Sequence, residues 1–288
     1  MPIHRRYITA EPGQPTGFFD FIRLTLEDDG QSQPRQRLWY SAAGLWVLSL
    51  ILTPVLEDIG GRPAFLAMTN VSVVLHATVT LFALSFIWRT RTIVLASAVV
   101  VMSTWGIEAI GASTGVPFGH YVYTDALQPQ LADVPLLIPV AWLMMLPPSW
   151  AVADMFILRK RRHWPSHIKL AVVAGLAFAA WDLYLDPQMV GHGLWEWKTS
   201  GGYFGIPWVN FIGWWFSAFL ITLFVRPLNL PRARLAIVYT LVWLLELVGL
   251  GIMWSQPLPA LVGFVGMGAF VIPGWVTEYR RWKTVPTE

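Results

Sequence analysis

Cysteine is absent from this chain of 288 residues. Its absence excludes thiolate catalysis, disulfide bonds and cysteine-ligated metals, although it leaves the cellular compartment open. Charged side chains are also scarce: they make up 13% of the residues, about half the share found in an average soluble chain. Hydrophobic residues make up 55%, and the mean hydropathy is +0.53. This composition excludes an ordinary soluble domain and indicates a polytopic membrane protein.

The chain contains several long runs of apolar residues with few charged ones. Windows of roughly 18 residues or more with almost no charge are long enough for an α-helix to cross a bilayer. About eight such spans are predicted, at residues 39–56, 70–88, 93–111, 134–157, 168–185, 208–226, 233–253 and 258–275. The predicted fold is therefore all-α: a polytopic integral membrane helical bundle with about eight transmembrane helices.

The chain outside the spans is short and mostly polar. Residues 1–38 are predicted to form a cytoplasmic N-terminal arm, 39–276 the transmembrane catalytic domain and 277–288 a short cytoplasmic tail. Within the arm, TGFFDFIRLTL (residues 16–26) is compatible with an amphipathic helix on the membrane surface and equally with a disordered segment.

The distribution of Lys and Arg predicts the orientation. If the N-terminus lies inside, only Arg62 and Lys198 of the 20 Lys and Arg residues fall on the outer side. Positive residues favour the cytoplasmic side of short loops. Both termini are therefore predicted to be cytoplasmic, and RKRRHW (residues 159–164) is explained as a cytoplasmic loop instead of a nucleic-acid site. We expect a multi-pass protein of the cell inner (cytoplasmic) membrane, with the lipid bilayer as its surroundings.

Acidic residues gather at one end of the spans. Each helix that runs outward carries carboxyl groups near its outer end or in its outer half: Glu57 and Asp58, Glu108, Asp182 and Asp186, and Glu246. Ionisable groups at membrane depth are costly and usually face an interior cavity or a partner. A carboxyl group removed from water also tends to hold its proton. Glu57, Asp58 and Asp186 fit an ordinary interfacial position as well, whereas Glu108, Asp182 and Glu246 lie deeper.

The fifth span ends with two aspartates. Asp182 and Asp186 are four residues apart, so they project from the same helix face. Pro187 disfavours continuation of the helix through Asp186, which predicts that Asp186 lies at the helix end. Asn210 begins the next span, where a buried amide needs a partner that a nearby carboxyl can supply. The glycines of GGYFGIP (residues 201–207) permit irregular backbone, which at membrane depth must be covered by protein or line a cavity.

Aromatic residues are dense in the two outer loops that follow Glu108 and Asp186. The candidates for a binding site are Tyr121, Tyr123, Trp195, Trp197, Tyr203, Phe204, Trp208 and Trp214. An interfacial aromatic belt is one explanation, and it accounts for tryptophans at span ends. The density of this group favours the other explanation, a slot in which flat rings line a long polyene and their π faces stabilise a developing cation.

Two motifs carry a resemblance to a known family. GxPFGxYxY at residues 115–123 and DPxMxxxGxWxW…GGYFGIPxxNFxGW at residues 186–214 resemble the carotenoid-biosynthesis membrane family of bacteria and archaea. The resemblance covers roughly residues 39–275 and is most specific between 182 and 214. Members of that family include carotenoid 1,2-hydratases of the γ-carotene hydratase and bisanhydrobacterioruberin hydratase type.

The resemblance implies a hydro-lyase that works without a cofactor. It would add water to the terminal isopropylidene double bond of an acyclic carotenoid end group, with other enzymes of the pathway as further candidate partners. Asp182 or Asp186 would protonate the alkene, and Glu108 would handle the water. Glu246 would share the cavity, and Asn210 and Tyr203 would orient the acids or the water. The aromatic candidates named above would bind the polyene.

Three histidines are considered as metal ligands. His76, His120 and His192 lie on different segments without a recognisable ligand spacing, so no metal site is expected.

Two other functions compete with hydration. A small membrane lycopene cyclase protonates the same end group and lets an internal alkene capture the cation, which requires a dry pocket; the polar loop residues here favour water. A proton-coupled transporter would use the membrane acids as a relay. These acids, however, gather on one side instead of spanning the bilayer midplane.

Overall fold

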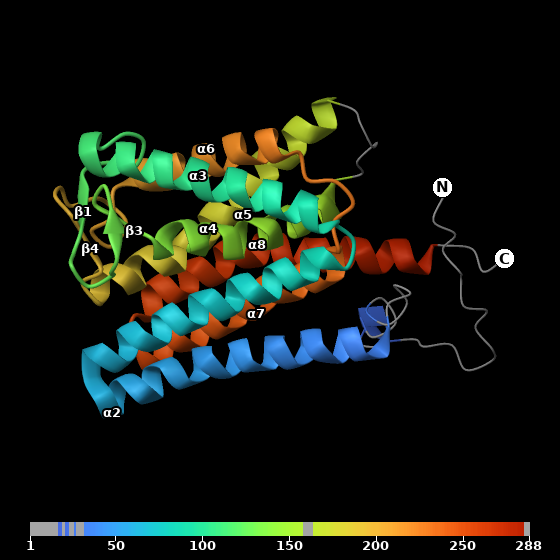
Figure 1. Cartoon of the computed structure of the whole chain (residues 1–288), viewed down its shortest axis with the longest axis horizontal. Helices are drawn as coiled ribbons and strands as arrows, with labels where there is room; N and C mark the ends of the chain where they lie inside the picture. Colours follow the sequence, from blue (N-terminus) through green and yellow to red (C-terminus); the bar gives the residue numbers. More distant parts are fainter. Residues whose placement is uncertain (1–16, 19–20, 23–25, 27–31, 158–163, 285–288) are drawn as a thin grey trace.

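The computed structural model describes residues 17–18, 21–22, 26, 32–157 and 164–284. The helices are α2 (Gln33–Ser85), α3 (Thr90–Thr114), α4 (Leu137–Phe156), α5 (Trp164–Gly191), α6 (Trp208–Val225), α7 (Arg232–Val248) with the π-helix η1 (Gly249–Met253), and α8 (Pro257–Lys283). In this described part of the chain, 7 helices are long and apolar enough to cross a membrane. They lie roughly parallel in one bundle (Figure 1), which confirms the all-α polytopic fold.

The helix α2 supplies the first two predicted spans, because it folds back on itself. The bend is at Gly61, whose φ of 65° lies in the left-handed region that glycine adopts without a steric penalty. The limbs on either side of the bend run antiparallel (Figure 1). Ser72 Oγ donates to Ser49 Oγ across them at 3.1 Å. The predicted spans 39–56 and 70–88 are therefore two limbs of one kinked helix.

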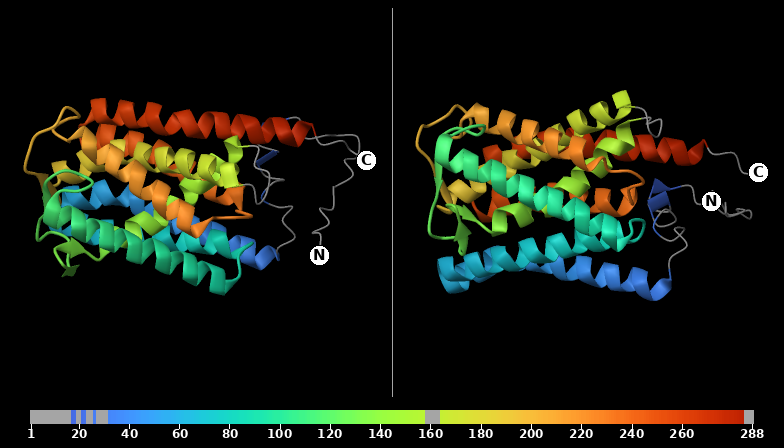
Figure 2. Two further views of the ribbon diagram at one scale, coloured as in Figure 1. Left: turned by 90° about the horizontal axis from the view of Figure 1, so that it is seen from above. Right: turned by 45° about the horizontal axis from the view of Figure 1, so that its top comes forward.

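The two ends of the bundle differ. The start of α2 and the end of α8 lie at the same end, as two views show (Figures 1 and 2). The cytoplasmic location of that end, and the domain limits at residues 38 and 276, stay predictions. The basic residues 159–162 and most of the N-terminal arm lie outside the described residues. In the described part of the arm, Phe21 is helical and packs against Tyr279 of α8, with ring centroids 5.5 Å apart.

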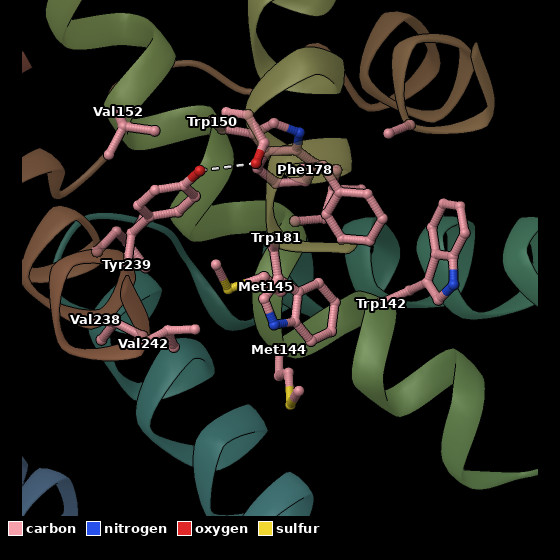
Figure 3. Packing of buried hydrophobic residues seen from close by; sticks show 14 of the residues in the cluster. Trp142, Met144, Met145, Trp150, Val152, Phe178, Trp181, Val238, Tyr239 and Val242 are labelled. Atoms are coloured by element: carbon pink, nitrogen blue, oxygen red, sulfur yellow. Dashed lines mark hydrogen bonds between the residues drawn. The ribbon is translucent and has the colours of Figure 1, made fainter. Parts of the chain in front are cut away.

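The helix α4 occupies the centre of the bundle. It packs against α2, α3, α5, α7 and α8, and most of its residues are buried. Trp142 and Trp150 of α4 fill the core beside Phe178 of α5 and Tyr239 of α7 (Figure 3). The Tyr239 hydroxyl donates to Ala177 O at 2.8 Å, so its polar group is satisfied inside the core. A helix that is apolar all round is expected at such a central position.

The helix α5 corrects one sequence prediction, since it continues past Pro187 to Gly191. Asp186 therefore lies inside the helix and not at its end. Proline has no N–H, so the carbonyl of Leu183, four residues earlier, loses its usual helical donor. The Tyr203 hydroxyl donates to Leu183 O at 2.8 Å and replaces that donor. Tyr203, expected to orient the acids or the water, instead supports the backbone of α5.

The loops that follow α3 and α5 are joined by strands that the sequence did not predict. Strands β1 (Tyr121–Tyr123) and β4 (Trp195–Trp197) pair antiparallel at the end of the bundle opposite the end of α8 (Figure 1). The other short pair, β2 (Gln130–Leu131) with β3 (Val134–Pro135), leads into α4. Side chains alternate between the faces of a strand. Both tyrosines of β1 and both tryptophans of β4 therefore share one face, and Val122 and Glu196 lie on the other.

Candidate active site

The shared face of β1 and β4 holds a carboxyl group through its tyrosines. Glu108, near the end of α3 that leads to β1, is 2% exposed. Its Oε2 accepts hydrogen bonds from the Tyr121 hydroxyl at 2.6 Å and the Tyr123 hydroxyl at 2.9 Å. Burial raises the pKa of both tyrosine hydroxyls, and the charge of the adjacent Glu108 raises it further. Both hydroxyls therefore stay protonated and act as donors at neutral pH.

The same face holds a second carboxyl group through its tryptophans. Asp186 Oδ1 accepts hydrogen bonds from Trp195 Nε1 at 2.6 Å and Trp197 Nε1 at 3.3 Å. Tyr121 lies opposite Trp197, and Tyr123 lies opposite Trp195. Four aromatic donors on one small sheet thus fix two carboxyl groups that come from different helices, α3 and α5.

A third carboxyl group is tied to the second by one amide. Asn210, in the first turn of α6, donates from Nδ2 to Asp182 Oδ2 and to Asp186 Oδ2, at 2.7 Å each. Both aspartates are buried, as is Asn210. Asp182 Oδ1 is also buried and has no hydrogen-bond partner among the described residues. Asn210 was expected to bond to one carboxyl group, and it bonds to two, those of Asp182 and Asp186.

The carboxyl groups of Glu108 and Asp186 line one cavity of about 30 Å³. That volume has room for about two water molecules. The other lining residues are mostly aromatic or aliphatic, and they come from α3, α4, α5, α6 and both outer loops: Phe118, Tyr121, Tyr123, Ile138, Ala141, Trp142, Leu185, Trp195, Trp197, Asn210 and Trp214. The arrangement is an apolar chamber with two acidic groups and a few polar donors.

The deep wall of the cavity is built from stacked rings. Trp214 of α6 stacks on Phe178 with centroids 5.2 Å apart, and Trp142 of α4 lies 4.9 Å from Trp214. Gly213 lets α6 approach the loop that carries Phe118, because a Cβ there would lie 2.6 Å from Pro117 O. Trp142 and Trp214 of this packed wall line the chamber, where aromatic rings stabilise a cation if one forms.

The structure brings most of the candidate site residues together around this cavity. The residues that line it or bond directly to its carboxyl groups are Glu108, Asp182, Asp186, Asn210, Tyr121, Tyr123, Trp195, Trp197 and Trp214. Sequence reasoning missed Phe118, Ile138, Ala141, Trp142 and Leu185, which also line it. Phe118 belongs to the motif at residues 115–123, so the signal for it was present.

Three aromatic candidates lie apart from the cavity. Tyr203, Phe204 and Trp208 pack on one another, with centroids 4.8 Å apart for Tyr203 and Phe204 and 5.5 Å for Tyr203 and Trp208. Phe204 is 48% exposed and Trp208 is 57% exposed. Phe204 and Trp208 therefore face the outside of the bundle, as an interfacial aromatic belt would, whereas Tyr203 is buried against α5. None of the three lines this cavity, and their assignment to the polyene slot stays a prediction.

Glu246 also lies apart from the cavity. It sits near the end of α7, beside Tyr184. Tyr184 is two residues from both Asp182 and Asp186, which places it on the opposite face of α5. Glu246 Oε2 is buried and finds no hydrogen-bond partner in the described part of the chain. The expectation that Glu246 shares the cavity is therefore wrong.

His76 and His192 lie in different parts of the bundle. His76 packs on Trp46 between the limbs of α2, with centroids 4.3 Å apart. His192 stacks on Phe65 at 3.9 Å. Across residues 32–157 and 164–284, together with the few described residues of the arm, no group of three or more His, Cys, Asp or Glu is placed to hold a metal ion.

Comparison with known proteins gives this geometry a context. A family model described as carotenoid biosynthesis protein matches residues 68–270, a stretch that contains every residue lining the cavity. The chain belongs to the carotenoid biosynthesis protein family. This confirms the resemblance carried by the motifs at residues 115–123 and 186–214.

A curated relative adds a more specific similarity. The chain is 31% identical over 124 residues to bisanhydrobacterioruberin hydratase of Haloarcula japonica. The match covers 43% of this chain and 41% of that protein, so less than half of the relative's length is matched. No solved structure matches the chain.

Proposed function

We propose that this protein is a carotenoid hydratase of a bacterial or archaeal inner membrane. It adds water, without a cofactor, to the terminal isopropylidene double bond of an acyclic carotenoid end group, such as that of γ-carotene, lycopene or bisanhydrobacterioruberin. One observation carries the proposal: Glu108 and Asp186 line the same ring-walled cavity. Family membership and the similarity to a hydratase support it.

The aspartate pair is the proton donor in this reaction. Asp182 and Asp186 accept from the same Asn210 nitrogen, and repulsion between two carboxylates so close together favours a state in which they share one proton. Asp186 faces the cavity and delivers the proton to the less substituted alkene carbon, so that the π electrons form the new C–H bond. The donors on Asp186 from Trp195, Trp197 and Asn210 stabilise the carboxylate that remains.

The product of this protonation is a tertiary carbocation at the carbon that carries the methyl groups. It forms beside the two carboxyl groups, once the chamber widens from its volume of about 30 Å³ to admit the end group. The rings of Trp214 and Phe118 line that place and attract positive charge. The Asp186 carboxylate adds an opposite charge on the same wall. Trp195 and Asn210 already donate to Asp186, so this carboxylate needs little reorganisation when the charge develops.

Water then captures the cation with help from Glu108. The water oxygen forms the C–O bond, and Glu108 accepts the proton that water loses. That proton returns to the aspartate pair through the cavity, which restores the starting state. Hydration is redox-neutral and balances with substrate and water alone, so the residues of the cavity are sufficient for it.

The test is conversion of a carotenoid in a host that makes lycopene or γ-carotene. The wild type is expected to give a product with the mass of one added water, whereas a cyclase would give an isomer of unchanged mass. Asp182→Asn, Asp186→Asn and Glu108→Gln are each expected to reduce conversion strongly. Glu196→Gln, on the outward face of β4, is the matched control and is expected to be fully active. Full activity in all three cavity variants would end the proposal.

A further inference from the structure

The indole N–H of Trp142 is a buried donor that makes no hydrogen bond of normal geometry to the described residues. Trp142 is 0% exposed, and its Nε1 finds no hydrogen-bond partner among the residues that the structure describes. The ring itself is fixed, since it packs against Phe178 at 4.7 Å and Trp214 at 4.9 Å between centroids. Figure 3 shows Trp142 next to Phe178 in this packed wall. Buried polar groups that are left unpaired are rare, and each one calls for an explanation.

The carboxyl group of Glu108 is an acceptor beside Trp142 on the wall of the cavity. The Trp142 N–H is close enough to the Glu108 carboxyl group to interact with it, but the two make no hydrogen bond of normal geometry. Both side chains line the same cavity. The tyrosines Tyr121 and Tyr123 both donate to Glu108 Oε2. Glu108 Oε1 is therefore available for another donor. An unpaired donor and an available acceptor thus face one small polar space inside an apolar chamber.

We propose that Trp142 Nε1 and Glu108 Oε1 together bind the water molecule that attacks the cation. This inference rests on the proposed hydratase function and deepens it. A bound water requires two to four polar partners and a cavity larger than about 15 Å³. The cavity of about 30 Å³ and these two groups meet that requirement.

The two contacts orient the water for attack. Trp142 donates its N–H to one lone pair of the water oxygen, and the water donates one hydrogen to Glu108 Oε1. The second lone pair then points into the chamber and forms the C–O bond, while Glu108 takes the proton. Trp142 is in this sense the residue that commits the cation to hydration, since it touches the attacking water.

Loss of the Trp142 N–H should change the fate of the cation without changing its formation. A cation that is not captured by water loses a proton from the carbon that was protonated, and the Asp186 carboxylate accepts it. The alkene is regenerated, and in heavy water it carries deuterium at that carbon. Hydration and deuterium uptake into recovered alkene therefore report capture and protonation separately.

The experiment uses the purified full-length protein with its carotenoid in heavy water, with Trp142→Phe compared to the wild type. Hydration is expected to fall about tenfold, the effect of one lost hydrogen bond in the transition state. Deuterium uptake into recovered carotenoid is expected to stay within about twofold. An equal fall in both, or no change in hydration, would overturn the inference.

Trp46→Phe is the matched control. Trp46 is also 0% exposed with an unpaired Nε1, but it packs on His76 between the limbs of α2, away from the cavity. It is expected to keep both hydration and uptake. A loss of hydration in Trp46→Phe as large as in Trp142→Phe would show a general effect of removing a buried N–H, and would also overturn the inference.

A second variant keeps the test decisive if Trp142→Phe does not fold. Position 142 then receives a tryptophan analogue with sulfur in place of the indole N–H, which preserves the ring shape and removes only the donor. The same split between hydration and uptake is expected. If the wild type itself hydrates no carotenoid, the proposed function fails; if the wild type is active and both variants match it, only the water site fails.

Discussion

Tyr121 and Trp197 lie opposite each other across β1 and β4, with ring centroids 5.4 Å apart, yet they donate hydrogen bonds to carboxyl groups of different helices. Tyr121 donates to Glu108 of α3, and Trp197 donates to Asp186 of α5. The register of one short sheet therefore sets the distance between the two acidic groups of the cavity. The predictions below follow from this arrangement.

Removal of the tyrosine donors should weaken catalysis while the rings remain. In a Tyr121→Phe and Tyr123→Phe double variant, Glu108 loses both donors to Oε2 and is no longer held in place. The hydration rate is expected to fall by about tenfold to a hundredfold. Val122→Ala, on the opposite face of β1, provides the comparison in the same rate assay. Equal rates in the double variant and Val122→Ala would show that the hydroxyls do not serve Glu108.

Asn210 should contribute to both stability and activity. Asn210→Leu removes the donor shared by Asp182 and Asp186 and leaves two buried oxygens unpaired. The expected cost is about 1–3 kcal/mol of unfolding free energy, together with a large loss of hydration. The control is Asn70→Leu, which removes an amide bonded to Leu66 O in α2. Thermal unfolding and the hydration rate are measured for both variants. Full hydration by Asn210→Leu would contradict the role of the shared amide.

Tyr203 should affect stability much more than chemistry. Tyr203→Phe leaves Leu183 O without a donor where Pro187 supplies none. A loss of about 1 kcal/mol in unfolding free energy is expected, with a hydration rate within about threefold of the wild type. Denaturant unfolding and initial rates measure the two effects. A hydration rate as low as that of Asp186→Asn would instead show that Tyr203 takes part in catalysis.

Glu246 should be dispensable for hydration. It lies beside Tyr184 on the far side of α5, and not at the cavity. Glu246→Gln is therefore expected to hydrate the carotenoid within about twofold of the wild-type rate. A large fall in the hydration rate, in a variant whose unfolding temperature is unchanged, would show that Glu246 contributes to hydration.

Much of the fold could be predicted from the sequence, because apolar length and charge placement are local signals. The spans, the carboxyl groups at their outer ends and the same-face spacing of Asp182 and Asp186 follow from periods and lengths alone. The clustering of aromatics at 193–215 also marked the loop that carries Trp195 and Trp197. The helices and the common face of Asp182 and Asp186 are confirmed, whereas the side of the membrane on which the carboxyl groups lie stays a prediction.

The errors arose where one segment depends on another. The continuation of α5 through Pro187 requires a hydroxyl from Tyr203, sixteen residues beyond it in sequence, to satisfy Leu183 O. The strands β1 and β4 have three residues each, too few for a periodic signal, and pair across a long separation. The exposure of Trp208 likewise depends on how α6 is turned within the bundle. Such contacts are tertiary, so propensity and local pattern do not specify them.

The central claim is that Asp186 and Glu108 act in turn on one alkene terminus. The direct test is a comparison of Asp186→Asn and Glu108→Gln in heavy water, with hydration and deuterium uptake into recovered carotenoid measured together. Asp186→Asn is expected to lose both, because no proton is delivered. Glu108→Gln is expected to lose hydration while it retains uptake. Retained uptake in Asp186→Asn, or hydration by Glu108→Gln at the wild-type rate, would contradict the account.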